Sequence, residues 1–590
     1  MQESAVKLLG NPYGEAIYEN FKSNNRAFAD KSLIIESLEQ TDMPRYPVLL
    51  RPRRFGKSTF VQMLKCFYDI SYKERYRKIF FKTAIYSKKL NSHNSYHVLN
   101  FDFSRVGTQS AEAVRCSFFS AVALGIDNFM RRYPDFEFSY DGLNKSDSVT
   151  LFNNFVSAYL RYSDQGRLYV MIDEYDNFAN QILSHDSNLF KRITGDGGFL
   201  KDFYAAIKAS AGDGGCIART FITGVSSVSL DSLTSGFNIA RNVTARECFN
   251  NYAGFTEDEL RALIPQLVDI TRLGVDVSEI LAKMKPVYDG YCFSRFAKNT
   301  VYNSSMCLYY LDEMRLANEF LSPEQYTDPA SDHDGSKLRQ LFTIAEDGLA
   351  DVVIDTYLSG NDFFVSNLAE NINLNESEIY DRTQLLSMLY YLGYLTIDPE
   401  RSSKDGLALK IPNIFMSKLF ARCVSEMRFR SNVAFTRRSL DITPLLKASD
   451  DISTFVSSCT DFLTGIFSNQ VLSHMNEMAL NLALFAKLES LEGLLVELQK
   501  SLMVPGEGEK YADLVITANH RRSKECIYII ELKYVAKNET SAAKIEKLRR
   551  EAARQLRAYR SALEFKGRNV KSYPMIFSGS GCVYCRKLRG

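Results

Sequence analysis

The sequence has no tryptophan and only 6 histidines among 590 residues, and it has no excess of charge of either sign. Its 72 Lys and Arg residues against 70 Asp and Glu leave a net charge of +2, so no global basic field marks it as a nucleic-acid binder. No apolar run approaches the roughly 18 residues that a membrane-spanning helix needs. We therefore expect no membrane partner.

The cysteines form no regular frame. There are 11 of them, an odd number, scattered along the chain without a secretory signal peptide before them. This pattern is typical of a reducing compartment and predicts a cytoplasmic protein. Cys582 and Cys585 form a C-x₂-C pair, but no two further zinc ligands lie near it in the sequence. We favour a simple strand end over a metal or redox site and leave the role of the pair open.

Ordinary composition and a long chain predict a multidomain globular protein. Hydrophobic residues make up 45% and charged residues 24% of the sequence, as in soluble globular proteins. The length suits roughly three or four domains. No internal repeat or low-complexity tract interrupts it.

The main motif is Arg-Pro-Arg-Arg-Phe-Gly-Lys-Ser at residues 51–58. It lies between a short apolar run at 46–50, predicted as a buried strand, and an apolar pattern at 59–67 with helical spacing. Strand, turn and helix around Gly-Lys-Ser are typical of a P-loop, whose amide N–H groups face nucleotide phosphates. Lys57 would then meet the outer phosphates and Ser58 would bind Mg²⁺. The predicted nucleotide-binding set is Arg51, Arg53, Arg54, Phe55, Gly56, Lys57, Ser58 and Thr59, with Asp173 and Thr223 from later strands.

One position departs from the usual pattern. The first Gly of G-x-x-x-x-G-K-[ST] is replaced by Arg51, where a positive φ would be costly. Either the loop turns differently or the site is weaker. The alternative is a chance Gly-Lys-Ser at a helix start.

A second strand ends in acids. Residues 168–172 are apolar and Asp173-Glu174 follow them, which is the Walker B pattern. A buried parallel strand delivers such carboxylates to the edge where α/β proteins bind ligands. Asp173 would hold Mg²⁺ and Glu174 would activate the attacking water. The alternative is a strand that ends in solvated acids. Thr223, closing the strand at 219–225, is a candidate γ-phosphate sensor, or simply a Thr at a strand end.

The flanking regions are predicted mostly helical. Residues 1–45 form a helical lead-in that could lie over the nucleotide base, and residues 250–330 form a helical lid over the nucleotide site. A helix at 382–392, followed by a strand and its partner at 407–412, is similar to a winged-helix module.

The C-terminal part carries a second chemistry. Asp513 lies in one predicted strand, and Glu531 and Lys533 lie in the next, after a polar turn at 519–524. Glu531 and Lys533 alternate with Leu532 and so share one face. Asp513, Glu531 and the carbonyl of Leu532 would bind Mg²⁺ or Mn²⁺. Lys533 would position the attacking water and stabilise the developing charge.

Two neighbouring helices strengthen this pattern. Glu477 in an upstream helix could reach the metal, and a downstream helix presents Gln555 and Tyr559 at i, i+4 spacing. Basic residues gather on the downstream helix, where a solvated helix face is the alternative. Two alternatives to an active nuclease site stay open: a degenerate, inactive copy of the site, and a coincidental match to the motif.

The ordered motifs resemble a family. Residues 51–58, 172–176, 221–226 and 288–291, then Asp513 with residues 531–533, are similar to AAA-ATPase-like proteins with a C-terminal PD-(D/E)xK nuclease domain. This resemblance spans nearly the whole chain, and in that family the Arg at position 51 is usual. It implies the roles given above for Lys57, Ser58 and the acids of both sites.

The expected fold is α/β and multidomain. It comprises a P-loop NTPase sheet of AAA/STAND-like type (1–248), a helical lid (249–335), a winged-helix-like middle (336–445) and a restriction-endonuclease-like PD-(D/E)xK domain (446–590). The expected function is an ATPase that gates a metal-dependent nuclease, with ATP and Mg²⁺ or Mn²⁺ as cofactors. The expected partner is nucleic acid, DNA before RNA, and a homo-oligomer is possible. The alternatives are a signalling switch with an inactive nuclease fold and an ATP-binding module that never hydrolyses.

Overall fold

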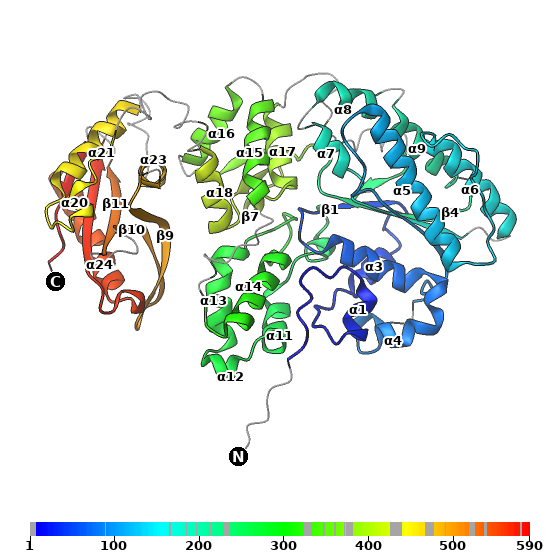
Figure 1. Cartoon of the computed structure of the whole chain (residues 1–590), viewed down its shortest axis with the longest axis horizontal. Coiled ribbons are helices and arrows are strands. Elements are labelled where there is room, and N and C mark those ends of the chain that lie inside the picture. The colour runs from blue at the N-terminus through cyan, green and yellow to red at the C-terminus, as the bar shows by residue number, and fades with distance from the viewer. Residues whose placement is uncertain are drawn as a thin grey trace, which may run out of the picture. The chain divides into compact units, whose positions relative to one another are not determined.

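In the computed structural model the chain forms two compact units (Figure 1). One unit comprises residues 1–349 and 363–416, and the other comprises residues 350–362 and 417–590. The structure describes residues 8–88, 90–163, 167–183, 186–195, 198–212, 214–228, 237–321, 323, 332–345, 348–358, 362–370, 372, 381–424, 427, 439–466, 477–489, 491–518, 525–535, 540–578 and 581–589. The expected domain boundaries stay predictions.

A five-stranded parallel sheet forms the centre of the first unit. Its strand order is β2-β3-β4-β1-β5. The strands are β1 (Pro47–Leu50), β2 (His97–Asp102), β3 (Leu168–Asp173), β4 (Ile217–Gly224) and β5 (Arg241–Asn242). β4 therefore lies between the P-loop strand β1 and the acid-ended strand β3. β1 and β3 are buried along their whole length, which fits their unbroken apolar sequences.

Helices cover both faces of this sheet. The helices before the lid are α1 (Tyr18–Ser23), α2 (Ile34–Leu38), α3 (Lys57–Tyr68), α4 (Tyr76–Phe80), α5 (Ala111–Arg132), α6 (Ser148–Tyr162), α7 (Asn177–Leu183), α8 (Ser187–Thr194) and α9 (Phe199–Ala209), with short 3₁₀ turns η1 (Ile70–Arg75), η2 (Ala84–Ser87) and η3 (Glu247–Phe249). On one face Phe60 of α3 meets Phe221 of β4. On the other, Phe101 of β2 meets Phe152 of α6 and Phe203 of α9.

In the described part of the region expected to be a helical lid, four helices lie around their own core. They are α11 (Glu257–Leu267), α12 (Ile270–Leu273), α13 (Val277–Tyr288) and α14 (Ser304–Ala317). α11 begins at a capping box formed by Thr256 and Glu259. Leu263, Met284 and Leu311 are among the buried residues that join the helices.

The middle region contains helices and a small antiparallel sheet. The helices are α15 (Asp332–Ile344), α16 (Leu349–Leu358), α17 (Arg382–Tyr391) and α18 (Ile414–Val424). The strands β6 (Phe363–Val365), β7 (Thr396–Ser403) and β8 (Gly406–Lys410) form a sheet of order β6-β8-β7. The expected helix with a following hairpin is therefore present as α17, β7 and β8.

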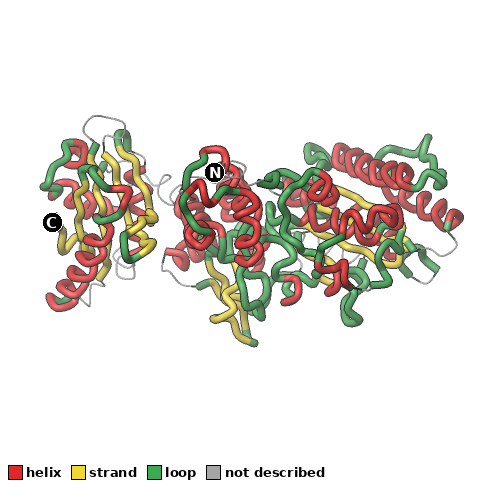
Figure 2. Tube along the Cα trace, turned by 90° about the horizontal axis from the view of Figure 1, so that it is seen from below, coloured by secondary structure: helices red, strands yellow, loops and turns green. Residues whose placement is uncertain are grey.

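The second unit is built on another five-stranded sheet (Figure 2), of order β13-β12-β11-β10-β9. The strands are β9 (Leu494–Val504), β10 (Gly508–Ala518), β11 (Cys526–Val535), β12 (Val570–Ser578) and β13 (Gly581–Cys585), and the helices are α20 (Thr443–Leu446), α21 (Ser453–Ile466), α23 (Glu477–Glu489) and α24 (Ala542–Arg560), with the 3₁₀ turn η8 (Leu563–Phe565). β11 and β12 are parallel, and the other neighbours are antiparallel. The predicted polar turn at 519–524 lies outside the described residues.

Within the described parts of the chain, none of the helices is both long and apolar enough to span a membrane. The 11 cysteines are free thiols, and most are buried.

Candidate functional site

The P-loop connects β1 directly to the N-terminus of α3. Gly56 is the N-cap residue and takes φ = 95°, a left-handed conformation that suits glycine. Arg54 also has a positive φ, of 68°. The loop therefore turns at residues 54 and 56, which removes the need for a glycine at residue 51.

Lys57 and Ser58 lie at the first turn of α3. The ammonium group of Lys57 is almost fully buried, donates to the Pro52 carbonyl at 3.2 Å and lies 3.4 Å from Glu174. The Ser58 hydroxyl hydrogen-bonds to Asp173. The structure therefore brings the predicted P-loop and Walker B side chains together.

Arg51 lies elsewhere than expected. Its guanidinium is buried and donates to the carbonyls of Leu50, Thr244 and Phe249 at 2.7, 3.1 and 2.6 Å. The rings of Tyr252 and Phe293 cover it at 4.9 and 4.1 Å. Arg51 thus fixes the end of β1 against the following segments, and its contacts are structural rather than directed at phosphate.

The other loop residues divide into two groups. Arg54, Phe55, Gly56, Lys57, Ser58 and Thr59 line one cavity of ≈ 320 Å³. Arg53 lies outside it and donates to the side-chain oxygen of Asn177 at 2.6 Å. Phe55 also packs edge-on against Tyr291 at 4.9 Å, which connects the loop to the lid region.

The two acids at the end of β3, Asp173 and Glu174, have different surroundings. Asp173 is 7% exposed, and burial together with the negative charge of Glu174 raises its pKa to about 7, against the stabilising effects of Ser58 and Lys57. One of its oxygens, Oδ1, has no hydrogen-bond partner. Glu174 lines the cavity with φ = 54°, a strained backbone for a residue other than glycine.

An orphaned carboxylate oxygen beside a serine hydroxyl fits a Mg²⁺ site. Such a buried oxygen is costly without a partner, and Mg²⁺ at a P-loop is held by this pair of residue types. Asp173 and Ser58 would hold the ion.

Thr223 points into the sheet. Its hydroxyl is fully buried and donates to the Leu49 carbonyl at 2.7 Å across the β4–β1 pair. It does not line the cavity. Its contacts match the alternative of a Thr closing a strand, and its role as a sensor stays a prediction.

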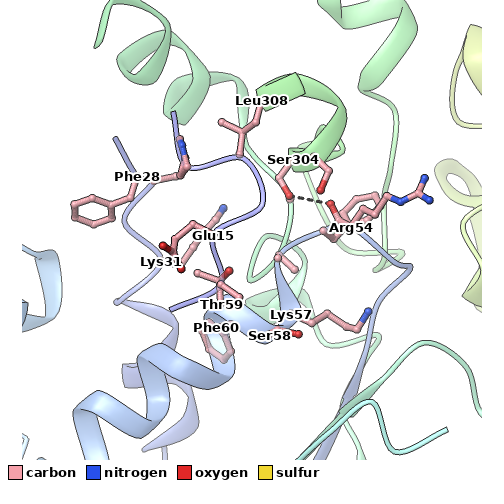
Figure 3. A pocket seen from close by; sticks show the side chains of 18 of the residues that line it. Glu15, Phe28, Lys31, Arg54, Lys57, Ser58, Thr59, Phe60, Ser304 and Leu308 are labelled. Atoms are coloured by element: carbon pink, nitrogen blue, oxygen red, sulfur yellow. Dashed lines mark hydrogen bonds between the residues drawn. The ribbon is translucent and has the colours of Figure 1, made fainter. Parts of the chain in front are cut away.

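The N-terminal segment forms the other wall of the cavity (Figure 3). Glu15, Phe28 and Lys31 come from this segment, and Ser304 and Leu308 come from α14. Lys31 pairs with Glu259 of α11 at 2.6 Å, and the Ser304 hydroxyl donates to the Arg54 carbonyl at 3.1 Å. Lead-in, P-loop and lid region therefore enclose one cavity of a size found for small-molecule sites.

In the second unit, Asp513, Glu531 and Lys533 meet between β10 and β11. Asp513 accepts a hydrogen bond from the Leu532 amide at 2.9 Å, and Lys533 lies 3.0 Å from Glu531. Glu531 and Lys533 are 1% and 6% exposed. The alternation read from the sequence places both on one face.

Charge and burial act against each other at this site. Burial raises the pKa of both Asp513 and Glu531, and the repulsion between them raises that of Glu531 further, while Lys533 lowers both. The pKa of Lys533 is raised by its acidic neighbours although burial lowers it. Two buried acids with raised pKa values are typical of a site that binds a cation.

Glu477 and Gln555 approach the same site from two helices. Glu477 at the start of α23 lies 3.3 Å from Lys533. Gln555 on α24 hydrogen-bonds to the Tyr559 hydroxyl, which itself donates to the Tyr511 carbonyl at 2.8 Å. Both residues thus lie near the acids, Glu477 directly and Gln555 through Tyr559.

The donor set fits a divalent ion. Oε2 of Glu531 is buried without a partner, and carboxylates with a main-chain carbonyl are ligands that Mg²⁺ and Mn²⁺ prefer. Asp513, Glu531 and the Leu532 carbonyl would hold the ion. Among the described residues, no three His, Cys, Asp or Glu side chains converge as a metal cluster, so this donor set depends on the carbonyl.

The comparisons with known proteins identify two domains, one for each of these regions of the chain. Residues 12–234 match a family model described as a predicted AAA-ATPase, and residues 507–587 match a model of the PD-(D/E)XK nuclease superfamily. The chain combines an AAA-ATPase-like domain with a PD-(D/E)XK nuclease superfamily domain. The ATPase-like model covers the P-loop and both Walker acids, and the nuclease model covers Asp513, Glu531 and Lys533.

Two further comparisons add little. No curated protein matches the chain. Among solved structures it is similar to the Walker-type ATPase PABY2304 of Pyrococcus abyssi, at 12% identity and a TM-score of 0.34 over 66% of this chain and 94% of that one.

Sequence reasoning missed Asp176 in the AAA-ATPase-like domain. This buried carboxylate accepts hydrogen bonds from the Val225 and Ser226 amides at 3.0 and 2.7 Å and from the Ser226 hydroxyl at 2.8 Å. A Cβ on Gly224 would approach Asp176 to 2.3 Å. Asp176 therefore fixes the segment after β4 to the Walker B strand.

It also missed Asn481, which lies in the second unit, before the residues that match the nuclease superfamily model. Asn481 is 4% exposed and hydrogen-bonds to Asp513, and its Oδ1 has no partner. It lies four residues after Glu477 on α23 and so on the same helix face. That spacing was the available signal, but an asparagine is unremarkable in a sequence.

The basic helix predicted downstream of Lys533 is α24, and the C-x₂-C pair lies at the end of the last strand. Ser541 caps the N-terminus of α24, and Arg549 and Arg550 of this helix both pair with Glu546. Cys582 and Cys585 lie in the last strand, β13. Burial raises the pKa of the Cys582 thiol to about 11 and raises that of Cys585 as well, which disfavours the reactive thiolate.

Proposed function

We propose that the AAA-ATPase-like domain binds and hydrolyses ATP, and that this gates a metal-dependent nuclease in the C-terminal domain, with DNA as the substrate. The observation that carries the proposal is the meeting of Asp513, Glu531 and Lys533, where a buried carboxylate oxygen of Glu531 lacks a partner. Defence against foreign DNA or handling of mobile elements fits such a pairing of domains.

In the ATPase-like site each side chain has a distinct role. Lys57 is held at the start of α3 by the Pro52 carbonyl and Glu174, so its charge is positioned for the outer phosphates. ATP would replace this contact, which frees Glu174 to orient and deprotonate water. Bound Mg²⁺ would neutralise phosphate charge. The N-terminal segment that forms the other wall of the cavity would lie over the base.

In the nuclease site the acids and the lysine divide the work. Asp513 and Glu531 would hold a divalent ion, which lowers the pKa of water and polarises the phosphodiester. Lys533 keeps its proton, because its acidic neighbours raise its pKa. It therefore positions the attacking water and stabilises negative charge on the phosphate, while Glu477 holds Lys533 in place.

A plasmid assay tests the proposal. The full chain is incubated with plasmid and Mg²⁺ or Mn²⁺, with and without ATP, and DNA and RNA are compared. Cutting is expected, and Asp513→Ala or Lys533→Ala should abolish it while ATP binding persists. Equal cutting by both variants and the unaltered chain would remove the nuclease assignment.

The second candidate is an ATP-dependent binding switch with an inactive nuclease fold. Lys533 already pairs with both Glu531 and Glu477, and such pairing competes with metal binding. This candidate predicts no cutting under any condition, with phosphate release from ATP that Glu174→Gln stops. Absence of phosphate release from the unaltered chain would leave only nucleotide binding.

A further inference from the structure

A second large cavity lies at the β2 edge of the ATPase-like sheet and shares no lining residue with the nucleotide cavity. β2 is the edge strand, and the cavity runs beside it between α3 and α5, with a volume of ≈ 770 Å³ against ≈ 320 Å³ for the nucleotide cavity. We call it the edge groove. Its charged lining residues are Lys65, Arg75, Arg105, Arg131, Arg132 and Asp102.

The edge groove is strongly basic in a nearly neutral chain. Five cationic side chains and one acid line it, whereas the whole sequence carries a net charge of +2. Such a local excess in a hollow focuses positive potential and attracts anions.

Two of the five cations are already compensated. Arg75 pairs with Glu19 at 3.0 Å and stacks on the ring of Tyr72 at 4.3 Å. Arg132 pairs with Asp69 at 3.2 Å. These contacts fix two sides of the groove.

The other three cations face the groove without an acidic partner. In the part of the chain that the structure describes, Lys65, Arg105 and Arg131 form no ion pair with a carboxylate. Burial and the charges of Arg132 and Arg75 lower the pKa of Lys65. An anion in the groove would relieve this crowding of like charges.

The rest of the lining suits the sugar-phosphate backbone of a nucleic acid rather than a nucleobase. Asn100 on β2 faces the groove, and its Oδ1 is buried without a partner. The face of Tyr72 is taken by Arg75. Among the described residues that line the groove, none offers a free aromatic face for stacking on a nucleobase. A sequence-independent contact to phosphates does not need one.

The groove is elongated. On α5 it is lined by Ser117, Ser120, Leu124, Asn128, Arg131 and Arg132, whose spacing follows one helix face. From 117 to 132 this stripe is roughly 22 Å long at about 1.5 Å per residue. Gly125 allows α5 to lie this close, because a Cβ there would meet Asn100 O at 2.8 Å. A trough of that length passes several backbone phosphates.

We propose that the edge groove binds the phosphodiester backbone of a nucleic acid without reading its sequence. The ATPase-like domain thereby makes its own contact with nucleic acid, separate from the nuclease site. This inference rests on the proposed function in taking nucleic acid as the chain's substrate.

Binding of a short labelled DNA duplex to the full chain tests the inference by fluorescence anisotropy. All proteins carry Asp513→Ala and the buffer contains EDTA, so binding is measured without cutting. The affinity of the triple variant Lys65→Glu, Arg105→Glu, Arg131→Glu for the duplex should be lower by roughly tenfold or more at salt concentrations between ~50 and ~200 mM. The slope of log affinity against log salt should fall by about 2–3, for three lost phosphate contacts.

A matched control separates the groove from net charge. Arg272→Glu, Lys298→Glu, Lys404→Glu changes three exposed cations in the same unit and should leave both affinity and slope nearly unchanged. Equal losses in the two triple variants, or none in the groove variant, overturn the inference. A further outcome is that the unaltered chain binds two ATP molecules, that the groove variant binds one, and that both bind the duplex equally well. This outcome overturns the inference in favour of a small phosphate ligand in the groove.

Separate control experiments address unfolding of the variants and failure of the plasmid assay. Should the charge reversals unfold the domain, Lys65→Gln, Arg105→Gln, Arg131→Gln replaces them, and an unchanged salt slope there refutes the inference. Failure of the plasmid assay for the unaltered chain concerns the nuclease proposal alone, since duplex binding is measured on a chain that cannot cut.

Discussion

Arg51 illustrates how one residue in a motif can serve the fold instead of the ligand. Its position in the P-loop pattern suggested a phosphate contact, yet three main-chain carbonyls and two aromatic rings surround its guanidinium. A buried guanidinium with this many partners is costly to replace, because each carbonyl would lose its donor.

Arg51→Lys should therefore destabilise the ATPase-like unit. A single ammonium group cannot reach the carbonyls of Leu50, Thr244 and Phe249 together, so we expect a loss of roughly 2–4 kcal/mol of unfolding free energy. Thermal unfolding followed by circular dichroism measures this, with Arg53→Lys, whose guanidinium reaches Asn177, as the control. An unaltered melting curve with lost ATP binding would instead restore the phosphate role.

The acids of the nuclease superfamily domain predict a pH dependence. The pKa of Asp513 is raised in the folded state, so its contribution to stability is present below its unfolded pKa of about 4 and is lost as pH rises through the folded value. Glu531 and Lys533 on β11, Glu477 on α23 and Tyr559 on α24 are the titratable groups around it.

Asp513→Asn should become more stable than the unaltered chain as pH rises from about 5 to about 8 in EDTA. The reason is that the amide carries no charge to desolvate. The melting temperatures of the two proteins across this pH range give the difference, and excess Mn²⁺ should shrink it by stabilising only the unaltered chain. A difference independent of pH would mean that Asp513 is not desolvated.

At the scale of elements, strand ends and helix starts carry the candidate site residues. β1 leads into α3, and β3 ends in the two Walker acids, so P-loop and acids meet at one edge of a parallel sheet. In the second unit β10 and β11 place an acid on each strand, and α23 adds Glu477 and Asn481 from one helix face. Asn481 then connects this helix to Asp513.

We expect Asn481 to be a positioning residue. Asn481→Leu removes the hydrogen bond to Asp513 and should weaken Mn²⁺ binding by roughly 10-fold or more, measured by isothermal titration calorimetry. Glu489→Gln, at the other end of α23, is the control. Asn481→Asp should recover metal binding at high pH, and unchanged Mn²⁺ affinity in the leucine variant would show that Asn481 only packs.

At the scale of the whole molecule, each compact unit holds one of the two sites. The nucleotide cavity and the edge groove lie in the first unit, and the nuclease site lies in the second. Any gating of cutting by ATP must therefore pass from one unit to the other, which makes it separable from the chemistry at either site.

Lys57→Ala should separate gating from cutting. Loss of the P-loop cation weakens ATP binding, so cutting of plasmid should no longer respond to ATP. Mn²⁺ binding at the nuclease site, measured by calorimetry, should be unaffected, because Asp513, Glu531 and Lys533 lie in the other unit. Cutting that still responds to ATP as in the unaltered chain would refute gating through this site.

The sequence by itself determined the strands and helices that bear the motifs, and it named Lys57, Ser58, Asp173, Glu174, Asp513, Glu531 and Lys533. These residues could be found because strand-end and helix-start patterns are local and the chemistry restricts the residue type. Only the tertiary structure decided that Arg51 and Thr223 point into the protein, that Asn481 reaches Asp513, and that cations from α3, α5 and the loop after β2 line one groove. Each of these depends on contacts between segments far apart in the chain, and periodicity within one segment carries no information about them.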